Sequence, residues 1–266
     1  MKKEMKKELD KIVNNLVSNL TQDLNVRWNA LDFEMEKKEV YEVLSGLLAR
    51  QITLAIQLSQ NFNCWTYDIA PLVLRCMTDN YINFAWIAKS PEVRSKQFIL
   101  YGLGQEKLQV EHLKNEIELK GSNKELEMMI KYREAWIDSH RYSFLTEVNI
   151  GSWSGISTRK MAEEADCIDF YNFVYTPFST AAHNMWGHIA RYNLRQSDNP
   201  LHKKINVPHL GDLVIDLHNV MLVTKYADKM LRSFDKTFSL NIEKESTYNQ
   251  FYSQFIAFEN KYRAEN

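Results

Sequence analysis

A charged pair within an apolar segment is the first feature that suggests chemistry. Residues 69–88 are almost entirely apolar or aromatic, and their two charges are Arg75 and Asp79. With Asn83, these residues recur every four positions and therefore share one face of a helix. Buried ions cost roughly several kcal/mol each unless they are paired and hydrogen-bonded. The pair is therefore either a structural ion pair of the core or part of a polar pocket in which Arg75 anchors an anion.

The order of the two charges favours partners on another helix. An acid that precedes a base by four residues is the more favourable arrangement on a helix. Here Arg75 precedes Asp79. Each side chain is therefore expected to find a better partner elsewhere in the fold.

A second segment, near residues 171–209, is rich in histidine and basic residues. Residues 183–209 contain four of the seven histidines. The other charged residues from 183 to 204 are Arg191, Arg195, Lys203, Lys204 and Asp198. Their net charge is +3 before any histidine is protonated. Clustered positive charge of this kind suits contact with the phosphates of RNA.

His183 is the candidate for general acid–base chemistry. Pro177 predicts a kink in a helix over residues 168–194, and Ser179 or Thr180 would cap the restarted helix. His183 would then lie in or near the first turn, where the helix dipole favours bound anions and a neutral imidazole. Such an imidazole can transfer protons near neutral pH. A hydrogen-bonded core histidine is the alternative interpretation.

The histidine spacing does not predict a metal site. His183 and His188 are five residues apart, which separates them by about 140° around a helix. Paired zinc ligands on a helix are four residues apart and share one face. The sequence therefore predicts neither a metal ion nor a cofactor.

Helices must position these residues. Apolar residues recur at helical spacing along most of the 266-residue chain, and glycine (8) and proline (5) are scarce. The expected helices cover about 3–24, 34–60, 69–88, 91–119, 124–147, 158–166, 168–194, 209–235 and 242–263. Residues 149–157 and 195–208 are expected to be loops. The sequence predicts an all-α fold, a single helical bundle of about eight helices that forms one domain.

Composition narrows the class of protein. A net charge of −1 gives no strong overall attraction to nucleic acid or to an anionic membrane. Three cysteines without CxxC spacing argue against a disulfide framework and favour the reducing cytoplasm. The first 20 residues are not expected to act as a signal peptide, and no apolar run is predicted to span a membrane. We expect a cytoplasmic protein with no membrane partner.

Two blocks resemble a known bacterial family, domain of unknown function 5677. One is LVLRCMTDNYINFAWIAKSPEVRSKQF, which contains an arginine, an acid four residues later and a Pro helix start. The other is FYNFVYTPFSTAAHN, about one hundred residues further on. The resemblance covers about residues 40–195, on which the helices at 3–24 and 209–263 are expected to pack. The family usually has Glu where this chain has Asp79.

The resemblance implies an all-helical fold related to the higher-eukaryote and prokaryote nucleotide-binding helical bundles. Many of those proteins are RNases of toxin–antitoxin and phage-defence systems, and they often act as dimers. Their hallmark is an arginine followed by a histidine after four to six residues. Two stretches fit this spacing loosely, REAWIDSH (Arg133 to His140) and RQSDNPLH (Arg195 to His202).

These observations give three hypotheses of function. In the first, the protein is a metal-independent endoribonuclease in which Arg75, Asp79 and His183 are catalytic. The residues expected to bind and orient RNA are then Asn83, Tyr171, Tyr175, Ser179, His188, Arg191 and Arg195. In the second, a binding module without chemistry, such as a sensor or an antitoxin-like subunit, recognises a nucleotide or a cognate protein at the same place. For either function we expect a homodimer. In the third, the buried pair only fixes the register of the helices.

Overall fold

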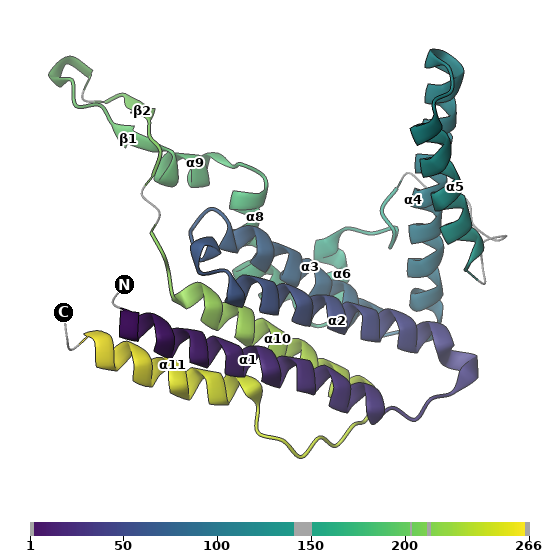
Figure 1. Cartoon of the computed structure of the whole chain (residues 1–266), viewed down its shortest axis with the longest axis horizontal. Coiled ribbons are helices and arrows are strands. Elements are labelled where there is room, and N and C mark those ends of the chain that lie inside the picture. The colour runs from purple at the N-terminus through teal and green to yellow at the C-terminus, as the bar shows by residue number, and fades with distance from the viewer. Residues whose placement is uncertain (1–2, 141–150, 203, 212–213, 264–266) are drawn as a thin grey trace.

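The computed structural model describes residues 3–140, 151–202, 204–211 and 214–263. Most of these residues are helical, which confirms the predicted fold class (Figure 1). The long helices are α1 (Lys3–Asn29), α2 (Lys38–Gln60), α3 (Ala70–Ile87), α4 (Pro91–Lys120), α5 (Lys124–Asp138), α10 (His218–Thr237) and α11 (Thr247–Arg263). The short elements are η1 (Met35–Lys37), η2 (Phe62–Cys64), α6 (Thr158–Glu164), α7 (Ile168–Phe170), η4 (Tyr171–Tyr175), α8 (Thr176–Ala182), α9 (Trp186–Tyr192) and η5 (Pro200–His202). Within the described ranges, each helix is too short or too polar to cross a bilayer.

The main body is a layered bundle with α2 at its centre. This helix packs against α1, α3 and α10, and α11 covers α1 and α10 (Figure 1). The apolar stripe of α2 explains its position, because Leu44, Leu48 and Ala55 are completely buried. A helix as apolar as α3 also belongs inside, and α3 contributes Leu74 and Phe84 to the core. That the whole chain forms one domain stays a prediction.

Helices α4 and α5 form an arm that projects from this body (Figure 1). Asn123 caps α5 by accepting a hydrogen bond from the backbone N–H of Leu126. The arm has its own small apolar cluster, formed by Val110, Ile130 and Ile137. This cluster is separate from the main core, so little apolar surface holds the two helices together.

The predicted break at Pro177 is wrong. Pro177 lies in the first turn of α8, directly after the π-helical turn η4. In η4 the N–H of Thr176 bonds to the carbonyl of Tyr171, five residues earlier. A wide turn of this kind accommodates a proline that a regular helix interior would not. The helix instead ends at Ala182, and Asn184 adopts a left-handed conformation with φ of 51°.

The predicted loop at 195–208 contains a β-ribbon. Strands β1 (Leu194–Gln196) and β2 (Asn206–Pro208) pair antiparallel, with Leu194 opposite Pro208. The ribbon and α9 project from the bundle beside α8 (Figure 1). The last two helices also begin later than expected, α10 at residue 218 and α11 at residue 247.

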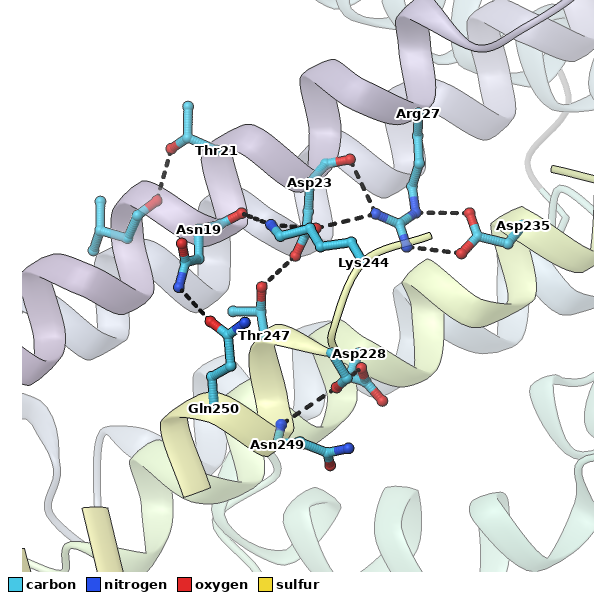
Figure 2. Close-up of polar contacts among 12 residues, drawn as sticks. Asn19, Thr21, Asp23, Arg27, Asp228, Asp235, Lys244, Thr247, Asn249 and Gln250 are labelled. Atoms are coloured by element: carbon cyan, nitrogen blue, oxygen red, sulfur yellow. Dashed lines mark hydrogen bonds and ion pairs between the residues drawn. The ribbon is translucent and has the colours of Figure 1, made fainter. Parts of the chain in front are cut away.

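A buried network of charges ties α1 to the end of the chain (Figure 2). Asp23 and Arg27 on α1 are 4 % and 7 % exposed. Arg27 donates from Nε and Nη2 to the two carboxylate oxygens of Asp235 on α10, each at 2.7 Å. Asp23 accepts from Lys244 Nζ at 2.9 Å and from Thr247 Oγ1 at 2.5 Å. Two positive and two negative charges therefore balance where α1, α10 and α11 meet.

Candidate functional site

Arg75 of α3 lies at the centre of a group of polar and aromatic side chains. It is 8 % exposed. Its Nη1 forms an ion pair with Asp79, and its Nε donates to Ser179 Oγ at 2.8 Å. The guanidinium carbon lies 3.4 Å from the centre of the Tyr175 ring, a cation–π contact. Arg75 therefore has a partner on another helix, Ser179 of α8, as the order of the two charges led us to expect.

Two facing elements position this group. Arg75 and Asp79 are one turn apart on α3, which packs against η4 and α8. Tyr175 and Ser179 are likewise four residues apart on η4 and α8. Ser179 donates its hydroxyl proton to the Tyr175 carbonyl at 2.8 Å, which leaves its oxygen to accept from Arg75. The π turn also stacks Tyr171 on Tyr175, with ring centres 4.6 Å apart.

Asp79 contributes a carboxyl to this group, and its pKa is raised. Desolvation by the surrounding atoms raises the pKa of Asp79, and the Arg75 and His183 charges only partly lower it again. Its side chain is still 42 % exposed, so solvent and a ligand can reach it. A reachable carboxyl with a raised pKa is a better proton acceptor than an ordinary aspartate.

The raised pKa of Asp79 predicts how stability depends on pH. The folded protein holds the proton of the Asp79 carboxyl more tightly than the unfolded chain does. In the unfolded chain the pKa of this carboxyl has its ordinary value of 3.8. Binding of this proton therefore stabilises the folded state fully at pH values below 3.8. The stabilisation is lost as the pH rises through the pKa of Asp79 in the folded protein. Measured by urea unfolding, the wild type is expected to lose stability relative to Asp79→Asn as pH rises from 3.8. A difference that grows in the opposite direction would contradict the assignment.

His183 lies at the C-terminal end of a helix, whereas the sequence predicted a place near an N-terminal end. It directly follows the last residue of α8, and its side chain is exposed. The predicted place in a first helical turn is wrong because the helix does not restart at Ser179 or Thr180. Both residues lie inside α8. The charge of His183 nevertheless helps to lower the pKa of Asp79.

The remaining predicted binding residues lie in two places. Asn83 is half-buried on α3, one turn beyond Asp79. His188 and Arg191 lie on α9, and Arg195 lies on β1. His188 and Arg195 contact residues outside the Arg75 group. His188 Nε2 lies 3.2 Å from Asp68 Oδ1, and Arg195 forms an ion pair of 2.6 Å with Asp198. Arg191 is exposed. The contacts of His188 and Arg195 thus lie outside the Arg75 group.

The two Arg–His stretches also have a place in the fold. Arg133 of α5 forms an ion pair with Glu106 of α4, and His140 follows the end of α5. Arg195 and His202 lie on β1 and η5, so no single helix carries both. In the part of the chain that the structure describes, no three His, Cys, Asp or Glu side chains are arranged to hold a metal ion.

Thr158 is a member of the group that the sequence did not indicate. It begins α6, and its side chain hydrogen-bonds with Tyr175. Burial and the Asp79 charge raise the pKa of Tyr175, and these effects outweigh the Thr158 hydrogen bond and the Arg75 charge. Spacing along the chain could not reveal Thr158, because it meets Tyr175 only through the fold.

Comparison with known proteins gives one match. The model of a family described as "Family of unknown function (DUF5677)" matches residues 41–200. This range contains every residue of the group around Arg75, and also α9 and β1. No curated protein and no solved structure matches the chain.

Proposed function

This chain belongs to the family of unknown function DUF5677, and from that premise we propose that it is a metal-independent endoribonuclease. Its substrate would be RNA, and its biological role that of an effector in a toxin–antitoxin or phage-defence system of the cytoplasm. The proposed catalytic residues are Arg75, Asp79 and His183.

One observation supports this proposal above the others. Arg75 and Ser179 are 104 residues apart in the chain, yet in the fold Arg75 Nε lies 2.8 Å from Ser179 Oγ. Their meeting joins a buried cation to a carboxyl with a raised pKa, on which the charge of His183 also acts. Cleavage of RNA through its 2′-hydroxyl requires a base, an acid and positive charge beside the phosphate.

The reaction assigns one role to each side chain. The Asp79 carboxylate takes the proton from the ribose 2′-hydroxyl, whose oxygen attacks the adjacent phosphorus. The bond from phosphorus to the 5′-oxygen breaks, and protonated His183 gives that oxygen its proton. The products are a 2′,3′-cyclic phosphate and a free 5′-hydroxyl. Arg75 holds Asp79 in place and stabilises the negative charge that develops on the phosphate.

The surroundings of Arg75 support roles in RNA binding. Tyr171 and Tyr175 offer aromatic rings, on which bases or riboses can pack. The positive charges of Arg191 and Arg195, with His188 on α9, would attract the phosphates of the strand that leads to the site.

A binding module without chemistry is the second candidate. Its support is the number of partners that Arg75 already has: Asp79, Ser179 and the Tyr175 ring. A cation so fully engaged within the protein suits a site that recognises a nucleotide or a cognate protein without transforming it.

The wild-type protein tests the first candidate. It would be incubated with end-labelled single-stranded RNA in EDTA, beside the same oligonucleotide made entirely of 2′-deoxynucleotides. We expect cleavage of the RNA alone, and fragments that carry 2′,3′-cyclic phosphates. Cleavage of both strands would exclude attack by the 2′-hydroxyl. Binding of intact RNA or a nucleotide without cleavage would favour the second candidate.

A further inference from the structure

Helix α5 exposes an apolar stripe on the projecting arm. Its exposed large side chains, with their exposed fractions, are Met128 (64 %), Met129 (46 %), Tyr132 (76 %) and Trp136 (44 %). Ala135 is also exposed. At 100° per residue these five positions span about 120° of the helix surface. We call them the α5 stripe.

A different face of α5 already packs within the arm. Ile130 and Ile137 are buried against α4, on the side of the helix that faces away from the stripe. A helix with apolar residues on two sides packs between two partners. Here α4 covers one side, and the small cluster of the arm gives α5 little other support. The second side therefore needs a partner from outside the described chain.

We propose that the α5 stripe is the interface of a homodimer, with α5 of one copy packed antiparallel on α5 of a second copy. The two α4–α5 arms then form a four-helix bundle. The twofold axis passes beside Tyr132.

The order of residues in the stripe supports a second copy as the partner. About a twofold axis, a residue a given number of positions before the centre meets the residue the same number after it. From Tyr132, the stripe residues lie at offsets of −4, −3, 0, +3 and +4, which is a symmetric set. Met128 then faces Trp136 of the second copy, and Met129 faces its Ala135. A large side chain meets a small one in the latter pair, and both tyrosines meet at the axis.

The size and shape of the surface agree with a dimer. Two aromatic rings and two methionines on each copy would bury on the order of 1,000 Å² in total, the lower limit for a specific interface. A groove of about 360 Å³ runs beside the stripe, lined by Glu106, Met129, Tyr132, Arg133 and Trp136. Glu106 and Arg133 pair with each other, so covering the groove strands neither charge.

Sedimentation velocity on the full chain over a range of concentrations tests the proposal. The wild type is expected to have about twice the monomer mass of 31.4 kDa. Tyr132→Glu would place two like charges at the axis and is expected to give a folded monomer with an unchanged circular dichroism spectrum. Leu201→Glu is the matched control, because Leu201 is 89 % exposed on the other projection. This control is expected to remain a dimer.

Crosslinking locates the interface independently of stability. In a chain whose exposed Cys76 is replaced by serine, Tyr132→Cys is expected to form a disulfide-linked dimer. Lys131→Cys, one residue away and about 100° around the helix, is expected to form none. A wild type that is monomeric at every concentration would overturn the proposal. So would a dimer that survives Tyr132→Glu and in which Tyr132→Cys does not crosslink.

Discussion

Replacing Arg27 with methionine is expected to lower the free energy of unfolding by about 3–5 kcal/mol, the usual cost of removing one partner from a buried ion pair. Arg27 makes two hydrogen bonds of 2.7 Å to Asp235 and contacts Asp23 as well. Methionine fills a similar volume but leaves Asp235, whose side chain is 20 % exposed, without its cation. Asp23 would keep Lys244 and Thr247. Urea unfolding at neutral pH measures the loss.

An exposed ion pair provides the control for Arg27. Lys120 and Glu116 on α4 lie 3.0 Å apart with side chains 73 % and 43 % exposed. Lys120→Met is expected to change stability by less than about 1 kcal/mol. If Arg27→Met were as mild as Lys120→Met, the network of Figure 2 would not stabilise the contact between α1 and α10.

The second large effect concerns the proposed chemistry. Loss of a general acid or base slows catalysis by about 10²–10⁴-fold, which is about 2.7–5.5 kcal/mol of barrier. We therefore expect Asp79→Asn and His183→Ala each to reduce the RNA cleavage rate by that factor. Asparagine retains the shape of the carboxyl and cannot take the proton. Single-turnover cleavage with excess enzyme measures the chemical step.

A histidine elsewhere separates catalysis from general damage. His112 is exposed on α4 of the projecting arm, and His112→Ala is expected to cleave at the wild-type rate. The pH–rate profile gives a second readout. The rate should fall as the pH is lowered, because Asp79 becomes protonated. Since the pKa of Asp79 is raised, this fall should begin at a higher pH than for an ordinary carboxylate base. If His183→Ala cleaved as fast as His112→Ala, His183 would not be the general acid.

The sequence predicted most of the helices and a partner for Arg75 on another helix. Helical periodicity and the shortage of glycine and proline identified most long helices, because their apolar stripes match the core that they form. The surplus of apolar residues around Arg75 and Asp79 predicted that α3 is internal. The expectation of a partner for Arg75 on another helix agrees with the contact to Ser179.

Local rules failed where the fold supplied a compensating feature. Pro177 predicted a break in the helix because proline has no N–H to donate. The π turn before it accommodates the proline, so the helix continues to Ala182. His183 consequently follows α8 instead of starting it. The β-ribbon was missed because its strands have three residues each and show no alternation of apolar and polar residues. Asp23 and Arg27 resemble an ordinary surface pair in the sequence, since Asp235 lies 208 residues beyond Arg27.

That separation has a consequence for the order in which the molecule assembles during translation. Helix α1 leaves the ribosome well before Asp235 and Lys244, the partners of its buried charges, are made. At about 5–20 residues per second, the 208 residues from Arg27 to Asp235 require roughly 10–40 s of synthesis. Throughout this interval, burial of Asp23 and Arg27 would leave the two side chains with only each other as charged partners. The nascent helix must therefore keep this face in water or on a chaperone until Asp235 and Lys244 emerge, so α1 docks late although it is made early.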